Sequence, residues 1–308
     1  MMRLTARVVA RYYDNIMTLA ATGGSRDRRI EDPTNLWIIH PAGRLLLPWF
    51  VARGISANMV SVAGLVLGVI AAAAYYHWSS WPAVVLGGTL SILWLIADGL
   101  DGMIARATNT ASPLGRFLDG FCDHGVFILI YVAMATEIGT GEGWALALTA
   151  GAAHAFQSNV YEGERARFHR RREGRPADPI VPSGNFLQRG YERGSAWVDR
   201  AARRFDEMLG RSPVPQRMAD AYAGAAVPPM RLMSLLSANV RVYAIFFACL
   251  AGNPRFFWWF EIVPLTVVLM VGFLWHRAVE TRIVRQFAVD TSFSSPPIPG
   301  LAKDVTKQ

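Results

Sequence analysis

The stretch of sequence around which the rest is organised is residues 98–123, DGLDGMIARATNTASPLGRFLDGFCD. Its four aspartates form two pairs with helical spacing, Asp98 with Asp101 and Asp119 with Asp123. Residues three or four apart share one face of a helix, so each pair points to one side. Residues 109–113 are typical of a turn, and Pro113 suits the first turn of the next helix. The pattern therefore predicts two helices, joined by a short turn, that present their carboxylates to each other.

Long apolar segments surround these aspartates. Of the 308 residues, 52% are hydrophobic and only 18% are charged, against about 25% charged in an average soluble domain. Six segments are long enough to cross the roughly 30 Å of hydrocarbon in a bilayer: residues 58–78, 83–105, 114–136, 144–162, 230–250 and 257–279. We therefore expect an all-α polytopic membrane protein with six transmembrane helices. The composition excludes a disordered chain, and the two cysteines exclude a disulfide scaffold.

The distribution of arginine predicts the orientation in the membrane. The net charge is +8, and almost all of the positive charge is arginine. The three short turns on one side contain only Arg255, whereas the N-terminal segment, the 163–228 connection and the C-terminal tail contain most of the others. Cytoplasmic loops carry the excess of basic residues, so both termini, the connection and the aspartates should face the cytoplasm. Residues 1–35 contain no secretory signal, and we expect a bacterial inner membrane protein.

Aromatic residues gather at the opposite ends of the predicted spans. They predict a belt at the outer interface of the membrane, made of Tyr75, Tyr76, Trp78, Trp81, Trp144, Phe256, Phe257, Trp258 and Trp259. The belt and the arginine asymmetry indicate the same orientation in a membrane. Their agreement disfavours a soluble helical protein with an apolar core. Basic charge spread between apolar runs also argues against nucleic acid as a partner and for membrane lipids.

The same patterns predict three regions. Residues 1–54 form a cytoplasmic N-terminal segment, in which residues 36–53 read as an amphipathic helix at the membrane interface. Residues 55–285 are expected to form the six-helix transmembrane domain, and residues 286–308 a cytoplasmic tail. Within the domain, residues 163–228 form a basic insert. We expect a solvated, partly helical loop that rests on anionic lipid, with a role in substrate gating as the alternative.

Carboxylates that converge near a membrane repel one another and usually mark a functional site. A divalent cation would relieve the repulsion, and an all-oxygen ligand set without matching His or Cys suits Mg²⁺ or Mn²⁺ rather than zinc. A pair of such ions can clamp the attacking and leaving oxygens of a phosphate. The small residues nearby fit either close approach of a ligand or tight helix packing: Gly99, Gly102, Ala105 and Gly115.

The pattern Asp-x2-Asp-Gly-x2-Ala-Arg-x8-Gly-x3-Asp-x3-Asp resembles the signature of the CDP-alcohol phosphotransferase (CDP-alcohol phosphatidyltransferase) family. Every fixed position is met: Asp98, Asp101, Gly102, Ala105, Arg106, Gly115, Asp119 and Asp123. Six spans preceded by an amphipathic helix are also similar to the family. The insert at 163–228 and the tail after about residue 285 are not covered by the resemblance.

The resemblance implies an enzyme that cleaves a CDP-linked donor, transfers the phosphoryl-containing group to an acceptor alcohol and releases CMP in phospholipid biosynthesis. It implies that Asp98, Asp101, Asp119 and Asp123 hold two Mg²⁺ or Mn²⁺ ions, and that Asp123 is also the general base. The cytidine and pyrophosphate site would include Gly102, Ala105, Gly115 and Asn58, with Arg106 either against phosphate or paired with an aspartate. Homodimerisation is also common in the family.

Two donors fit the resemblance, and of the two we expect CDP-diacylglycerol. Six spans favour phosphatidyl transfer from CDP-diacylglycerol to a polar alcohol. Residues 108–115 instead look like the choline/ethanolamine phosphotransferases of the family, which use a CDP-linked head group and a lipid hydroxyl. A divalent-cation transporter is a third interpretation, disfavoured because the aspartates lie at the cytoplasmic ends of two spans rather than at the membrane midplane.

Arginines near the predicted site are candidates for binding the acceptor. Arg165, Arg231 and Arg241 would suit a phosphorylated or carboxylated acceptor. For Arg241 an interhelical salt bridge to a carboxylate is an equal alternative. For His124 we expect a plain polar contact, and we expect His154 and His276 to be structural.

Overall fold

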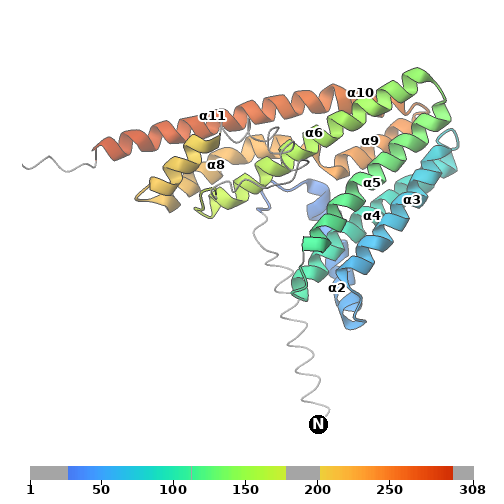
Figure 1. Cartoon of the computed structure of the whole chain (residues 1–308), viewed down its shortest axis with the longest axis horizontal. Helices are drawn as coiled ribbons and strands as arrows, with labels where there is room; N and C mark the ends of the chain where they lie inside the picture. The colour runs from blue at the N-terminus through green and yellow to red at the C-terminus, as the bar shows by residue number, and fades with distance from the viewer. Residues whose placement is uncertain (1–26, 112, 178–201, 294–308) are drawn as a thin grey trace, which may run out of the picture. The chain divides into compact units, whose positions relative to one another are not determined.

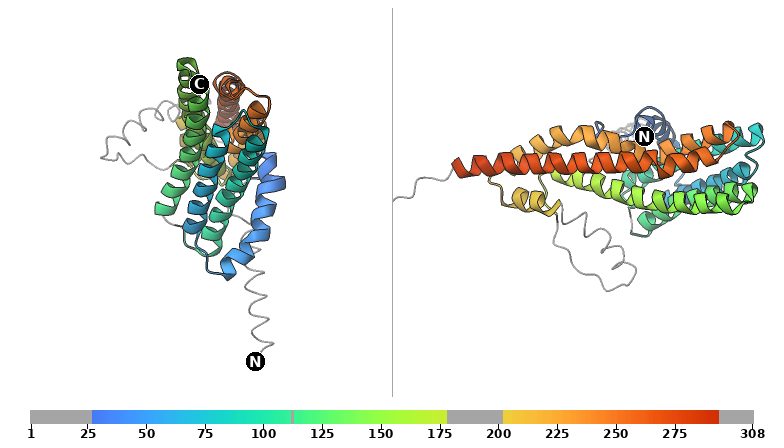
Figure 2. Two further views of the ribbon diagram at one scale, coloured as in Figure 1. Left: turned by 90° about the vertical axis from the view of Figure 1, so that its right-hand side faces the viewer. Right: turned by 90° about the horizontal axis from the view of Figure 1, so that it is seen from above.

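The computed structural model describes residues 27–111, 113–177 and 202–293, and every regular element in these ranges is helical (Figures 1 and 2). The side chains of residues 113–119, 121 and 289–293 lie outside the description. The all-α prediction is therefore confirmed for the described residues. The helices are η1 (Asn35–Ile39), α2 (His40–Ala52), α3 (Ala57–Tyr76), α4 (Trp81–Ala107), α5 (Pro113–Ile138), α6 (Gly141–Arg172), α8 (Pro215–Met233), η2 (Ser234–Leu236), α9 (Ala238–Leu250), α10 (Arg255–Ile262) and α11 (Pro264–Phe293). Residues 202–211 are also helical.

Contacts within the chain define two compact units. The first contains residues 1–169 and 227–273, and the second contains residues 170–226 and 274–308. These units are described separately below. The three regions expected from the sequence were defined by predicted membrane topology and not by contacts, so their limits differ from those of the two units. These limits stay predictions.

In the first unit, α3 packs against α4 and α5, and α4 also packs against α2 and α9. Glycines allow the closest approaches, because a Cβ at Gly68 would lie 2.2 Å from Val126 on α5. A Cβ at Gly88 would lie 2.4 Å from Phe246 on α9. Small residues bring helices together in this way in membrane proteins, where van der Waals packing is the main attraction between them.

The predicted turn between the two aspartate pairs is confirmed. Helix α4 ends at Ala107, and α5 begins at Pro113. Asn109 adopts a left-handed conformation with a φ of 52°, which asparagine tolerates better than most residues. The turn therefore reverses the chain within a few residues and places the second half of the 98–123 stretch beside the first.

Among the residues that the structure describes, three helical segments are long and apolar enough to cross a membrane: Ala57–Tyr76, Trp81–Ala107 and Arg255–Ala288. The segments Pro215–Leu236 and Ala238–Leu250, bent by 42° at their junction, would together make a fourth. With the exposed valines of α3 at Val62, Val66 and Val69, these helices support an integral membrane protein.

Helices occupy all six predicted ranges, but the count of six spans stays a prediction. Helix α6 is less apolar than expected, because polar residues gather around its middle: His154, Gln157, Ser158 and Asn159. Helix α5 carries side chains that the structure does not describe.

The predicted helix over residues 36–53 is present as η1 and α2. Its buried Leu47 packs in a cluster with Val60 of α3 and Leu100 of α4. Trp37 and Leu45 are 79% and 82% exposed, and Arg53 stacks over the exposed Trp49 at 3.9 Å from the ring centroid. These exposed apolar side chains support a helix that lies in the membrane interface, which stays a prediction.

The aromatic belt requires a correction. Trp81, Phe256 and Trp259 are exposed, as a belt requires. Tyr75, Phe257 and Trp258 are instead fully buried, because helical spacing turns them toward neighbouring helices rather than toward the membrane surface. The clustering of aromatic residues in the sequence therefore predicted a belt with more members than the structure supports.

The second unit is organised around the buried Arg171. Its guanidinium donates to Asp206 Oδ2 at 2.7 Å and Oδ1 at 3.0 Å, pairs with Glu280, and lies 4.6 Å from the ring centroid of Phe205. Phe205 and Leu209 are buried on the helix formed by residues 202–211. This described part of the basic insert is helical, as the partly helical loop that we expected allows, but its Phe205 and Leu209 are packed rather than solvated. Residues 178–201 lie outside the described residues.

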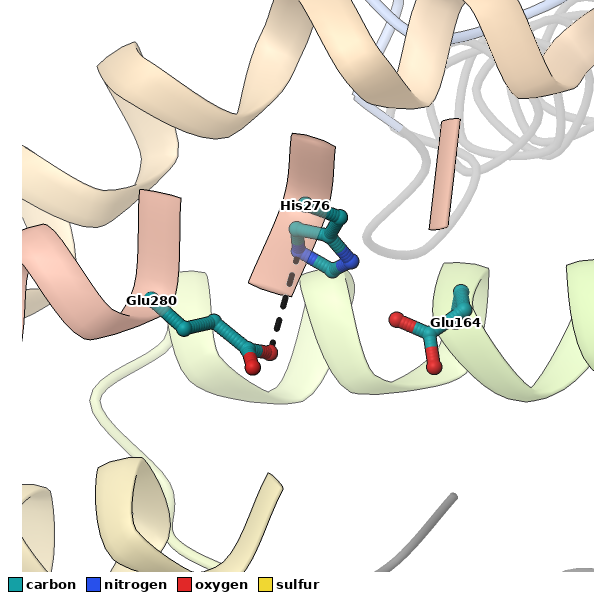
Figure 3. A group of neighbouring side chains, drawn as sticks. All are labelled: Glu164, His276 and Glu280. Atoms are coloured by element: carbon teal, nitrogen blue, oxygen red, sulfur yellow. Dashed lines mark ion pairs between the residues drawn. The ribbon is translucent and has the colours of Figure 1, made fainter. Parts of the chain in front are cut away.

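The carboxylate of Glu280 has several partners in the second unit. Figure 3 shows the ion pair of 4.0 Å between His276 and Glu280, one helical turn apart on α11. Arg277 also pairs with Glu280, and the hydroxyl of Tyr222 lies 2.8 Å from His276 Nε2. His276 thus has two partners in the second unit, and its structural role stays a prediction. Figure 3 also draws Glu164 of the first unit, which pairs with Arg167 of that unit.

Burial opposes ionisation of Asp206, but the hydrogen bonds and positive charges of Arg171 and Arg170 outweigh it and lower the pKa of this carboxyl. The unfolded chain, in which the pKa is about 3.9, then binds more protons than the folded protein below that pH. The contribution of Asp206 to stability is therefore present above about pH 4 and is lost as the pH falls through the lowered pKa.

We predict that Asp206→Asn lowers the melting temperature of the detergent-solubilised protein at pH 7, because removing one partner of a buried ion pair costs about 3–5 kcal/mol. The difference from the unchanged protein should shrink as the pH falls below about 4. Thermal unfolding followed at several pH values measures both effects. The matched control is Asp220→Asn, since Asp220 is exposed and only accepts from Gln216 at 3.1 Å. Equal losses for the two variants, or a pH-independent difference, would contradict the assignment.

Candidate functional site

Three of the four aspartates of the 98–123 stretch line one cavity of about 600 Å³ in the first unit. Asp98 and Asp101 enter it from the end of α4, and Asp123 enters it from α5. The side chain of Asp119 lies outside the described residues, although its position on α5 is one helical turn before Asp123. The structure thus brings together the three described carboxylates that helical spacing predicted to meet.

Asp101 is the most buried of the three, with 5% of its surface exposed. The hydroxyl of Ser61 on α3 donates a hydrogen bond to Asp101 Oδ2. Asn58 lies one turn earlier on the same helix and lines the cavity with Ser61. Sequence reasoning named Asn58 and missed Ser61. Its spacing of three residues from Asn58 was the only available signal, because its partner lies 40 residues away.

The predicted nucleotide-binding residues lie along the cavity, with one outside the description. Gly102, Ala105, Arg106 and Asn58 line the cavity, and Gly115 lies in the part of α5 whose side chains are not described. A Cβ at Gly102 would lie 3.3 Å from Arg106 Nη1, so the guanidinium folds back over this glycine. The guanidinium of Arg106 thus places a positive charge over Gly102, on the surface of α4 beside the aspartates, which suits a phosphate group.

Gly99 has a different role. A Cβ at this position would lie 2.9 Å from Ile39 Cγ2 of η1. This contact favours the packing interpretation, although Gly99 also borders the cavity. The glycines of the motif therefore divide between helix packing and the cavity surface.

Helix α6 forms another wall of the cavity. Its lining residues recur at helical spacing: His154, Ser158, Tyr161, Glu162 and Arg165. The guanidinium of Arg165 pairs with Glu162 at 2.8 Å and with Glu31 at 4.0 Å. Burial opposes its charge, but Glu162, Tyr161 and Glu31 outweigh burial and raise the pKa of Arg165. Its positive charge is therefore permanent and already matched by carboxylates.

The segment before η1 completes the cavity in a way that sequence reasoning missed. Asp32 accepts hydrogen bonds from Ser237 Oγ at 3.0 Å and Asn239 Nδ2 at 3.1 Å, and also from the backbone N–H of Thr34 at 2.7 Å. Asn239 Nδ2 also donates to Asn35 Oδ1 at 2.9 Å. Asn35, Ser237 and Asn239 all line the cavity. Because Asp32 and Asn239 are separated by 207 residues, no local pattern could reveal this arrangement.

Arg231 and Arg241 are not among the described residues that line the cavity. Arg231 is exposed on α8. Arg241 is fully buried and pairs with Glu261 of α10 through contacts of 3.0 and 3.1 Å. The salt-bridge alternative for Arg241 is thus what the structure shows, and of the three candidate acceptor residues only Arg165 reaches the cavity. A buried arginine in apolar surroundings is stable only when a carboxylate pairs with it, because an unpaired buried charge is costly. This explains why Arg241 contacts Glu261 and not the cavity.

The described side chains at the aspartate end of the cavity are of the chemical type that a hard divalent cation prefers. The carboxylates of Asp98, Asp101 and Asp123 offer oxygen ligands, and Ser61 holds Asp101 as an outer partner. The nearby His124 is exposed, and its Nδ1 lies 2.8 Å from the carbonyl oxygen of Gly120. This donor set suits Mg²⁺ or Mn²⁺. His124 makes the plain polar contact expected of it.

Comparison with known proteins agrees with the motif. Residues 54–170 match the family model described as CDP-alcohol phosphatidyltransferase, which confirms the resemblance stated above. The chain is 25% identical over 124 residues to ethanolaminephosphotransferase 1 of Pongo abelii, covering 36% of this chain and 31% of that protein. It is 31% identical over 124 residues to cholinephosphotransferase 1 of Gallus gallus, covering 33% of this chain and 37% of that protein. The chain thus spans about a third of the length of these curated relatives.

We predict that Ser61→Ala weakens Mn²⁺ binding about tenfold or more, because loss of an outer partner of a metal ligand typically costs 10–100-fold in affinity. Titration of the detergent-solubilised protein with Mn²⁺, followed by electron paramagnetic resonance, measures the affinity. The control is Ser91→Ala, since Ser91 is a buried serine of α4 that donates to the carbonyl oxygen of Gly87 at 2.8 Å. An unchanged affinity in Ser61→Ala would remove Ser61 from the site.

Proposed function

We propose that this chain, whose residues 54–170 match the CDP-alcohol phosphatidyltransferase model, is an integral membrane phosphotransferase of phospholipid biosynthesis. It would cleave the pyrophosphate of a CDP-linked donor, transfer the phosphoryl-containing group to an acceptor hydroxyl and release CMP. The observation that carries the proposal is that one cavity is lined by all six motif residues that the structure describes in full. They are Asp98, Asp101, Gly102, Ala105, Arg106 and Asp123.

The carboxylates of Asp98, Asp101, Asp119 and Asp123 would hold two Mg²⁺ or Mn²⁺ ions. When bound, such ions neutralise charge on the pyrophosphate oxygens. Gly102 and Ala105 would leave room for the pyrophosphate beside α4, and the guanidinium of Arg106, which lies over Gly102, would add a positive charge there. By the resemblance, Asp123 would also be the general base.

For the donor, we favour a CDP-linked amino alcohol with a lipid hydroxyl as acceptor. The printed names of the relatives, ethanolaminephosphotransferase and cholinephosphotransferase, support this choice. The cavity supports it too, because Arg165 is already matched by Glu162 and Glu31. A guanidinium that is already paired with two carboxylates would add little binding energy for a phosphorylated acceptor. Transfer from CDP-diacylglycerol, expected first from the sequence, stays the second candidate.

The arginine asymmetry supports a location in a bacterial inner membrane, with the termini and the cavity facing the cytoplasm. A homodimer, as in the family, is part of the proposal. Membrane lipids would then supply one substrate directly from the bilayer to a cavity formed by membrane-associated helices.

The experiment is CMP release by the purified full-length protein in detergent with Mn²⁺. CDP-choline, CDP-ethanolamine and CDP-diacylglycerol are offered in turn, the first two with diacylglycerol and the third with serine, glycerol phosphate or inositol phosphate. We predict release with an amino-alcohol donor, and a decrease of at least about 100-fold in Asp98→Asn and Asp123→Asn, since several kcal/mol of charge stabilisation would be lost.

Asp220→Asn on exposed α8 surface is the matched control and should retain full activity. Release with CDP-diacylglycerol alone would replace the favoured donor with the second candidate. Failure of every donor, from folded protein that binds Mn²⁺, would overturn the transferase proposal and favour cation transport.

A further inference from the structure

Two side-chain amides at the cavity are held in a fixed orientation by a chain of hydrogen bonds. Asp32 Oδ1 accepts from the backbone N–H of Thr34 at 2.7 Å, so this oxygen acts as an acceptor. The amide atom of Asn239 that lies 3.1 Å from it is therefore the donor Nδ2. The same nitrogen donates to Asn35 Oδ1 at 2.9 Å, and Asn35 Nδ2 in turn donates to Glu31 Oε2 at 3.2 Å. Both N–H protons of the Asn239 amide are thus used within the protein.

The amide oxygen of Asn239 is left for a ligand. Only 4% of the surface of Asn239 is exposed, yet this residue lines the cavity. Its Oδ1 accepts no hydrogen bond from the described residues, and it is not among the enclosed polar atoms that lack a partner there. This oxygen therefore borders open space, and the cavity is the space that the side chain lines. A rigid acceptor in such a place selects a ligand that carries an N–H or O–H group.

The charged groups linked to these amides are mostly negative. Glu31, Asp32 and Glu162 contribute three carboxylates. The one guanidinium that the described residues place among them is that of Arg165, 2.8 Å from Glu162 and 4.0 Å from Glu31. Asp32 also accepts from Ser237, directly before α9, and the partial charge of about +0.5 at the start of that helix is too small to reverse the sign. This part of the cavity therefore favours a cation.

An ammonium group meets both requirements, because it carries N–H donors and a positive charge. The amino group of cytosine is another N–H donor in a CDP-linked substrate, but it is neutral and gains little from the carboxylates. The residues proposed to hold the nucleotide also lie elsewhere, since Asn58 is on α3 and Gly102 is on α4. Asn35, Arg165 and Asn239 belong instead to η1, α6 and α9.

We propose that Asn239 determines which head group the transferase accepts, with its Oδ1 accepting a hydrogen bond from an ammonium N–H of the CDP-linked donor. The selected donor is a primary amino alcohol, CDP-ethanolamine, rather than CDP-choline. This inference rests on the proposed function. A quaternary ammonium has no N–H, so choline would leave the oxygen of Asn239 desolvated without a partner. Asp32 and Asn35 are positioning residues, because they act on the head group only through the Asn239 amide.

The first test varies the donor and leaves the protein unchanged. Isothermal titration calorimetry of the full-length protein in detergent with Mn²⁺, without acceptor, measures the affinity for CDP-ethanolamine and for its mono-, di- and trimethylated forms. We expect the three donors that keep an N–H to bind within about threefold of one another, and the trimethylated CDP-choline to bind about tenfold more weakly or worse. A pocket that recognises size alone would lose affinity gradually, with each added methyl group.

The second test removes the acceptor. We expect Asn239→Leu to bind CDP-ethanolamine about tenfold more weakly, with the affinities for CDP-choline and CMP within about threefold of those of the unchanged protein. The matched control is Ser237→Ala, which also loses a hydrogen bond to Asp32, of 3.0 Å, but leaves the oxygen of Asn239 in place. This control should keep the preference for CDP-ethanolamine.

Three results would overturn the inference. The first is similar binding of CDP-ethanolamine and CDP-choline by the unchanged protein, or binding of neither. The second is a gradual loss of affinity along the methylated series. The third is an equal loss for both donors and CMP in Asn239→Leu, which would assign Asn239 to the nucleotide or to folding. CMP release, measured separately, tests the proposed function. Release without a preference for CDP-ethanolamine overturns only the role of Asn239, whereas no release with any donor overturns the proposed function.

Discussion

The physical constraint on which this structure depends is the cost of holding carboxylates among apolar helices. A charged group in such surroundings needs a partner, because water cannot screen it. The chain meets this need in two ways. Glu261 forms an ion pair with the buried Arg241, whereas Asp98, Asp101 and Asp123 line a cavity. That second arrangement is suited to cations brought from outside, and it makes the aspartate cavity the centre of our functional account.

The remaining walls of the cavity serve that centre. Helix α3 supplies Ser61 to the most buried aspartate, and α6 supplies a stripe of polar residues that makes it less apolar than its neighbours. The segment before η1 is held against the start of α9 by Asp32. The hydrogen bonds of Ser61 and of Asp32 thus hold lining groups of the cavity in place before any substrate arrives. Such preorganisation is what transfer of a phosphoryl group requires of a protein.

The sequence predicted the features that depend on local spacing. The aspartate pairs, the turn at Asn109 and the helix before the first span all follow from patterns within a few residues. It missed Ser61, Asp32 and the setting of Asn239, because their partners lie far away along the chain. The assignment of Arg241 to the acceptor failed for the same reason. Its charge was visible in the sequence, but the carboxylate that neutralises it became apparent only when α9 and α10 were placed together.

The most direct test of the central claim is a crystal structure of the protein with Mn²⁺ and CMP, with data collected at a wavelength where manganese scatters anomalously. The account predicts anomalous peaks against Asp98, Asp101 and Asp123, with the phosphate of CMP beside Gly102 and Arg106. Anomalous peaks and CMP bound elsewhere, with these aspartates contacting only protein groups, would contradict it.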